Sequence, residues 1–116
     1  MSTAPQTQPI VSLSPFMGNR WWIKARVTDK SPIRTWNKNN SQGKLFSVTL
    51  VDESSAIRAT FFNEGVDQYD AMLVKDQVFY FSGGSCKAAN KKFNNVNCEY
   101  ELTFDGKSAV QKCNDD

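Results

Sequence analysis

The segment IRATFFNE, residues 57–64, combines an arginine with aromatic rings in a pattern typical of a β-strand. Side chains alternate between the two faces of a strand, so Arg58, Thr60 and Phe62 share one face while Phe61 points to the other. If the face of Phe61 is buried, the opposite face presents a guanidinium, which binds anions, and a flat ring, which stacks on other flat groups. The alternative is that Phe62 is a second core residue at a bend in the strand.

Residues that support catalysis or metal binding are scarce in this chain. It contains no histidine, and its cysteines, Cys86, Cys98 and Cys113, form no C-x-x-C pair. A zinc site therefore lacks its usual ligands at a usable spacing. The acids Asp52 and Glu53 leave a phosphohydrolase as a weak alternative, because adjacent acids in a tight turn are usually turn residues and no glycine-rich phosphate loop accompanies them. We expect no metal, no cofactor and no catalysis.

The basic residues are distributed unevenly along the chain. The formal net charge of +2 is too small to predict nucleic-acid binding by itself. However, residues 30–51 contain four basic residues and no acid, and residues 77–98 contain three basic residues and no acid. If the fold brings these two stretches together, they form a positive patch that the net charge hides.

Periodicity indicates which elements position these residues. Alternation of apolar and polar residues predicts five main strands, at residues 21–28, 44–52, 56–62, 78–82 and 100–104. A short strand at residues 33–36 and a polar loop at residues 37–44 separate the first two of them. Helical spacing of apolar residues predicts a helix over residues 64–73, with Asn63 as its N-cap. The Gly-, Asn- and Lys-rich residues 83–97 favour a protruding hairpin.

This order of elements, with a helix between the third and fourth strands, predicts an all-β OB-fold, a five-stranded Greek-key barrel that is partly open. In that fold the face of the second and third strands binds oligonucleotides or oligosaccharides, between two loops that are acid-free here. A chain of 116 residues holds one such domain. We assign residues 11–113 to the domain, residues 1–10 to a disordered leader or boundary segment, and residues 114–116 to a tail. No apolar run is long enough to span a membrane, and the first residues do not form a signal peptide.

The ordered motifs IRTW, GKLFSVTLVDES, IRATFFNE, VFYFS and YELTF resemble the large subunit of replication protein A, and within it the first of the central OB-fold domains. The resemblance covers residues 11–113, nearly the whole chain. It implies sequence-tolerant binding of single-stranded DNA in DNA replication, repair and recombination, a nuclear location, and a heterotrimer with other replication protein A subunits in the full-length protein. The alternative is an OB-fold adaptor that binds a protein or structured RNA.

The resemblance also implies two rings that stack on bases, Phe62 and Phe93. Stacking suits a binder that ignores sequence, because every base has a π-face. The other candidate residues for the groove are Arg34, Trp36, Arg58, Asn63, Glu64, Lys87 and Glu101, with Thr35, Lys38 and Lys91 beside them. The simpler alternatives are a hairpin tip packed on the barrel for Phe93 and ordinary solvated charges for the lysines. The chain departs from the family at Phe61, where a small residue is common, so the core beneath this strand must be repacked.

Overall fold

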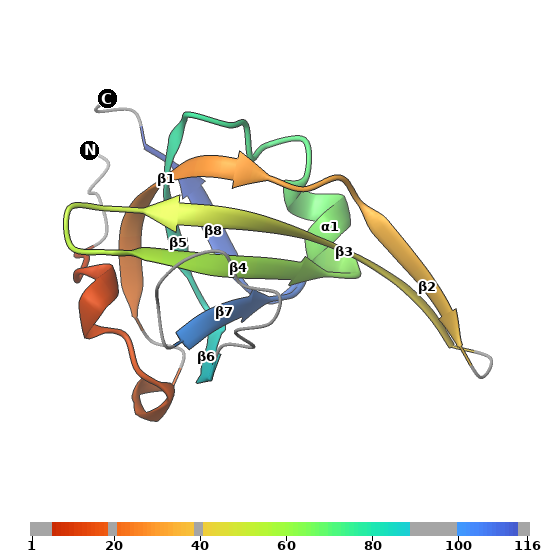
Figure 1. The fold of residues 1–116 in the computed structure, drawn as a ribbon, viewed down its shortest axis with the longest axis horizontal. Coiled ribbons are helices and arrows are strands. Elements are labelled where there is room, and N and C mark those ends of the chain that lie inside the picture. The colour runs from red at the N-terminus through yellow and green to blue at the C-terminus, as the bar shows by residue number, and fades with distance from the viewer. Residues whose placement is uncertain (1–5, 19–20, 39–40, 89–99, 114–116) are drawn as a thin grey trace.

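Eight strands of the computed structural model form one curled sheet (Figure 1). The structure describes residues 6–18, 21–38, 41–88 and 100–113. The strands are β1 (Trp22–Lys30), β2 (Arg34–Lys38), β3 (Ser41–Val51), β4 (Ala56–Phe62), β5 (Val78–Ser82), β6 (Ser85–Ala88), β7 (Tyr100–Phe104) and β8 (Ala109–Lys112). The helical elements are α1 (Glu64–Tyr69) and two short 3-10 turns, η1 (Ile10–Ser12) and η2 (Pro15–Met17).

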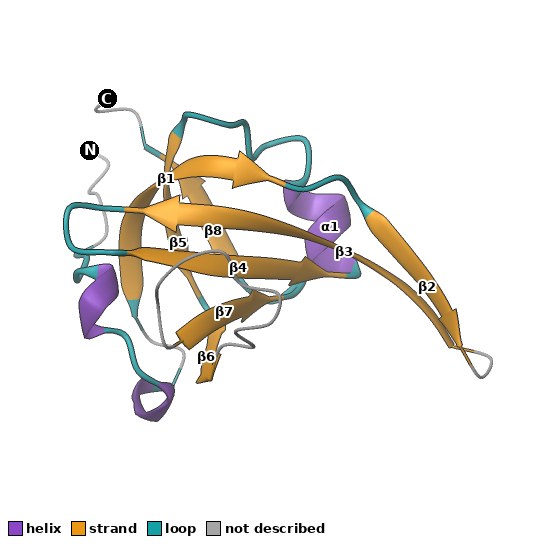
Figure 2. Ribbon diagram, in the orientation of Figure 1, coloured by secondary structure: helices purple, strands orange, loops and turns teal. Residues whose placement is uncertain are grey.

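The order of strands makes this sheet the partly open barrel that the sequence predicts. Neighbours follow the order β6-β7-β4-β3-β1-β5-β8, and β2 pairs with the outer part of β3. Only the β4–β7 pair is parallel among the pairs of described strands. Figure 2 shows the strands curling around a common interior, with α1 at one end. All five predicted main strands are present. Two strands that were not predicted extend the sheet, because β6 pairs with β7 and β8 pairs with β5.

The core contains a stack of aromatic rings centred on Phe61. This side chain is fully buried, and its ring lies parallel to those of Phe46 and Phe104, with centroids 5.1 Å and 4.8 Å away. Trp21 is also buried and meets Phe104 edge-on at 6.1 Å. Edge-to-face and offset-stacked geometries are the favourable arrangements of aromatic pairs. The large residue at position 61 is therefore accommodated as the middle ring of a stack.

The segment predicted as a loop at residues 37–44 is mostly strand, so this prediction is wrong. β2 pairs with the beginning of β3 from Arg34 opposite Leu45 to Lys38 opposite Ser41. Figure 1 shows these paired strands projecting from the barrel as a two-stranded ribbon, which we call the arm (residues 34–38 and 41–45). All of β2 is exposed, and the polar residues around it are typical of a loop. Cross-strand hydrogen bonds to β3 nevertheless keep it in a strand conformation.

The helix is shorter than the sequence predicts. α1 ends at Tyr69, and the chain continues in turns, in which the backbone N–H of Leu73 donates to the carbonyl of Tyr69 at 2.9 Å. Asn63 is the N-cap residue, as predicted, but its side chain makes no capping hydrogen bond. Its Oδ1 instead accepts a hydrogen bond from the backbone N–H of Lys44 at 3.2 Å, and therefore ties the root of the arm to the end of β4.

Residues 6–18, which we call the strap, run along one end of the barrel. Ile10 and Leu13 are buried in the main core, and the backbone N–H of Gln8 donates to the carbonyl of Trp22 at 2.9 Å. The sequence places residues 1–10 outside the domain, yet Gln8 and Ile10 are held by the barrel. Ile10, Val11 and Leu13 are too short an apolar run for periodicity to assign a buried face, so the burial of Ile10 is visible only in the structure.

The strap is fastened by the carboxylate of Asp52 in the turn between β3 and β4. Its Oδ2 accepts from the backbone N–H of Ile10 at 2.8 Å, and its Oδ1 accepts from the backbone N–H groups of Ser54 and Ser55 and from the Ser54 hydroxyl. Burial raises the pKa of Asp52, but the hydrogen bonds from Ser54, Ile10 and Ser55 outweigh it and leave the pKa below its usual value of 3.8. The carboxylate is thus a structural acceptor.

Replacing Asp52 by Asn is expected to destabilise the domain by about 1–2 kcal/mol at neutral pH, because an amide cannot accept all of these hydrogen bonds. Since the folded-state pKa is lowered, the stabilisation by Asp52 is present above about 3.8 and is lost as the pH falls through the folded-state value. Denaturant unfolding measured across acid pH should therefore show a weaker pH dependence for Asp52→Asn. The exposed neighbour Glu53, changed to Gln, is the control. Parallel pH curves for Asp52→Asn and the parent would contradict this role.

Candidate nucleic-acid interface

The outward side of β4 carries the residues that the sequence places there. Along this strand Ile57, Ala59 and Phe61 are buried, while the alternating residues remain partly exposed. The alternative that Phe62 belongs to the core is therefore wrong. Neighbouring strands extend this side in register, and we call the combined surface the outer face; its residues are Leu45, Ser47 and Thr49 of β3, Arg58, Thr60 and Phe62 of β4, Lys87 of β6, and Glu101 and Thr103 of β7.

A row of charged side chains crosses the outer face. Arg58, Glu101 and Lys87 lie directly opposite one another on β4, β7 and β6. Lys87 Nζ is 3.7 Å from Glu101 Oε1, and Arg58 Nη2 donates to the hydroxyl of Ser47 at 3.2 Å. The Ser47 hydroxyl also lies 3.2 Å from that of Thr60. Two cations around one carboxylate leave a modest positive charge at fixed positions.

The arm adds a second aromatic ring beside Phe62. Arg34, Trp36 and Lys38 alternate with Thr35 and Asn37 along β2, so these three share one side of the arm. The ring of Trp36 meets that of Phe62 edge-on, with centroids 6.3 Å apart and an angle of 74° between the planes. Trp36 remains 36% exposed. The two rings therefore form a corner at the end of the outer face.

The root of the arm is fixed at Lys44. Its backbone carbonyl accepts from the N–H of Asn63 at 2.9 Å, in addition to the bond that its own N–H gives to the Asn63 side chain. The ammonium of Lys44 forms an ion pair with Asp67 of α1. Asn63 adopts a positive φ of 51°, a conformation that is unfavourable for residues other than glycine. These contacts set the direction in which the arm leaves the barrel.

Three predicted site residues lie apart from the outer face. Thr35, Asn63 and Glu64 line a depression of about 720 Å³ between the arm and the start of α1. Its other lining residues are Trp36, Asn37, Gln42, Gly43, Lys44 and Asp67. Trp36 lines the depression and also contacts Phe62 of the outer face, so the depression flanks the corner of the two rings. Two further predicted site residues, Lys91 and Phe93, lie outside the described residues.

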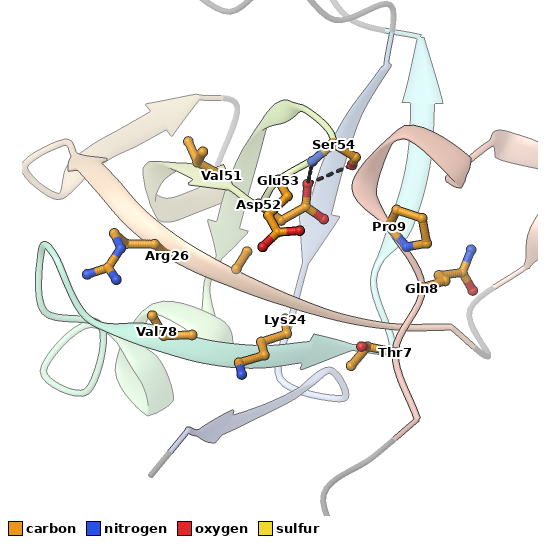
Figure 3. Close-up of a pocket in the computed structure, with 11 residues that line it drawn as sticks. Thr7, Gln8, Pro9, Lys24, Arg26, Val51, Asp52, Glu53, Ser54 and Val78 are labelled. Carbon is orange, nitrogen blue, oxygen red and sulfur yellow. Dashed lines mark hydrogen bonds between the residues drawn. The ribbon is translucent and has the colours of Figure 1, made fainter. Parts of the chain in front are cut away.

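A second depression of about 720 Å³ lies by the strap (Figure 3). Lys24 and Arg26 of β1 line one part of it, and Asp52, Glu53 and Ser54 of the β3–β4 turn line another. The dashed lines in Figure 3 mark the hydrogen bonds between Asp52 and Ser54. None of the described residues that line this depression is aromatic, so these residues provide no stacking platform.

Some residues of the interface escaped the sequence analysis. Thr60 and Thr103 face each other on the outer face, and neither was counted among the groove candidates, although alternation already places Thr60 beside Arg58 and Phe62. Gly43 lies opposite Trp36, and nothing in the sequence marks it because it has no side chain. Among the described residues, no cluster of three or more histidine, cysteine or acidic side chains suits a metal ion. None of the helices in the described part of the chain is long and apolar enough to cross a membrane.

Comparison with known proteins gives consistent results over most of the chain. A family profile described as "OB-fold nucleic acid binding domain" matches residues 21–106. The "Replication factor A 51 kDa subunit" of Crithidia fasciculata is 65% identical over 105 residues, which are 90% of this chain and 22% of that protein. The "Replication protein A 70 kDa DNA-binding subunit" of Mus musculus is 49% identical over 113 residues, which are 97% of this chain and 18% of that protein. The chain thus spans less than a quarter of the length of these relatives.

Solved structures with this fold include domains of Replication Protein A. The chain superimposes on DNA binding domain A of Saccharomyces cerevisiae Replication Protein A with a TM-score of 0.79 and 36% identity, over 95% of this chain and 96% of that domain. It also matches a chain of a Replication Protein A heterotrimer bound to ssDNA, with a TM-score of 0.89 and 45% identity, over 93% of this chain and 25% of that chain.

Proposed function

Because this chain belongs to the OB-fold nucleic-acid-binding family, and within it to the DNA-binding domains of the replication protein A large subunit, we propose that it binds single-stranded DNA with little sequence preference. The observation that carries this proposal is the ring corner of Phe62 and Trp36, in line with Arg58 on the face that OB-folds use for oligonucleotides. Ring stacking accepts any base, and the arginine supplies an anion contact. Lys87 and Glu101 complete this surface, and Arg34 and Lys38 line the arm beside it.

A preference for single strands over duplex is the direct test. Stacking on Phe62 requires a base whose face is free, which a duplex does not offer. Anisotropy titrations with a labelled pyrimidine oligonucleotide should show tighter binding than titrations with the same sequence as duplex. Equal affinity for both would reject the proposal. Tighter binding to a structured RNA or to a protein would favour the adaptor alternative.

The wider roles proposed here follow from the relatives. We infer that the chain acts as a binding module in DNA replication, repair and recombination in the nucleus, within a heterotrimer of replication protein A subunits. We propose no catalytic activity and no cofactor. The outer face offers stacking and anion contacts, and the carboxylate of Asp52 already accepts hydrogen bonds from the strap and from its own turn. Asn63, Thr35 and Glu64 are proposed to flank the bound strand, and Phe93 and Lys91 to contact it from the segment after β6.

Salt dependence should distinguish the charged residues from the rings. With roughly two to four phosphates neutralised, a single-strand slope of about −0.7 per contact predicts that log affinity falls with log salt at about −1.5 to −3. Arg58→Gln keeps a polar partner for Ser47 but removes the charge, so it should weaken binding to all sequences and make the slope shallower by about 0.7. Arg26→Gln, in the depression by the strap, is the matched control. An unchanged slope for Arg58→Gln would mean that this arginine does not meet a phosphate.

A further inference from the structure

The indole of Trp36 occupies the space above Gly43. The two residues are directly opposite each other in the arm. A Cβ atom at position 43 would lie 2.1 Å from Cζ2, 2.4 Å from Cη2 and 2.6 Å from Cε2 of Trp36. Real Cβ atoms essentially never approach another heavy atom below 3.0 Å. All three of the nearest atoms belong to the indole, so any residue other than glycine must displace this ring.

Displacing the ring would open the corner described above. Trp36 is 36% exposed, and its ring contacts that of Phe62 only edge-on. Among the described residues, no other aromatic ring packs against it. The backbone next to Gly43 has further contacts, because Lys44 is hydrogen-bonded to Asn63 and ion-paired with Asp67. The contact with Gly43 therefore decides where the indole lies, while the root of the arm stays in place.

We propose that Gly43 is a positioning residue for single-strand binding: its bare backbone seats Trp36 at a steep angle to Phe62, so that the two rings form a corner for one unpaired base. This inference rests on the proposed function. The face of Phe62 is the platform on which the base stacks, and Trp36 is the side wall that limits the base track at the arm. A ring displaced by a side chain at position 43 would either cover the platform or leave its end open.

A double-mutant cycle between positions 43 and 36 tests the proposal. Gly43→Ala and Trp36→Ala should each weaken binding of a thymidine oligonucleotide by about fivefold to twentyfold. The double variant should bind as well as Trp36→Ala alone, because the alanine at position 43 acts only through the indole. The salt slope should stay at the parent value in all three, since no phosphate contact is lost. Additive losses in the cycle, or parent affinity for Gly43→Ala, would overturn the proposal.

A rescue variant separates seating from general damage to the arm. Phenylalanine lacks the outer atoms Cζ2 and Cη2 of the indole benzo ring that a new Cβ would strike, so Trp36→Phe should restore part of the affinity lost in Gly43→Ala. Ser41→Ala, two positions away in β3 and outside the lining of the depression by α1, is the matched control and should bind like the parent. Failure of the smaller ring to rescue, with equal loss in Ser41→Ala, would overturn the proposal, because any change in the arm would then weaken binding.

A measurement without DNA keeps this inference distinct from the function itself. In Gly43→Ala the NMR shifts of the Trp36 indole N–H and of the Phe62 ring protons should move, since the two rings no longer shield each other. The melting temperature should change little, because both rings lie outside the core. Unmoved shifts would overturn the seating of Trp36 even if the parent binds single strands. Moved shifts with no single-strand binding by the parent would instead reject the proposed function, and with it the corner as a base site.

Discussion

Phe61→Ala is expected to lower the free energy of unfolding by about 3–5 kcal/mol, a large fraction of the stability of a small domain. The ring is fully buried between Phe46 and Phe104, so its removal leaves a cavity that these two rings cannot both fill. The expected loss includes the hydrophobic free energy that burial of the ring contributes and the packing lost around the cavity. Urea unfolding followed by far-ultraviolet circular dichroism measures this change directly.

The neighbouring residue is the control for this substitution. Phe62→Ala removes the same side chain from the same strand, but from the outer face, and should cost clearly less stability. Phe61→Leu keeps most of the volume and should fall between the parent and Phe61→Ala. Losses of equal size for Phe61→Ala and Phe62→Ala would mean that both rings support the core. The assignment of opposite faces to these two residues would then be wrong.

The faces of the strands were predictable because alternation is a local property. In IRATFFNE the period of two assigns each side chain to a face, and burial on one face then follows from the need for a core. The same alternation in β1 puts Ile23 and Val27 on one face, and both are fully buried. The helix after Phe62 was predicted for a similar reason, although its end was not. Helix ends depend on competition with turns, which is why Leu73 completes the apolar stripe from outside α1.

Features that depend on distant partners were not predictable in this way. The arm contains polar residues typical of a loop, and it is a ribbon only because β2 and β3 pair through them. Ile10 of the strap is buried because the Asp52 turn, forty-two positions away, accepts its N–H. Asn63 is the predicted N-cap residue, but its side chain accepts from the backbone of Lys44 across the sheet instead of capping the helix. In each case the deciding contact joins segments that the sequence does not bring together.

In the candidate site too, the positions that depend on local alternation were predictable, and those that depend on distant partners were not. Arg58 and Phe62 follow from alternation, and the register then brings Glu101 and Lys87 into their row. Thr35 lines the depression by α1, which motif matching alone could not resolve. Gly43 carries no side chain, so its relation to Trp36 is visible only in three dimensions. The resemblance supplied the residues, and the register shows how they are arranged.

Phe62→Ala is expected to weaken single-strand binding by about 1–3 kcal/mol, or roughly five- to 150-fold, a range taken from single-strand-binding proteins that include replication protein A itself. The loss should affect all sequences, because a ring stacks on every base. It includes a contribution from Trp36, which loses its edge-on partner when Phe62 is removed. Titrations with several homopolymeric oligonucleotides at one salt concentration measure it.

Two conservative variants separate stacking from apolar contact at this position. Phe62→Tyr keeps the ring and should bind within a small factor of the parent. Phe62→Leu keeps apolar bulk beside Leu45 and Trp36 but has no π-face, so it should resemble Phe62→Ala in binding and the parent in stability. The salt slope should be the same in all four proteins, because the phosphate contacts that we propose are those of Arg58 and Lys87. If Phe62→Leu bound like the parent, Phe62 would contribute surface area only, and the base-stacking role would have to pass to another ring.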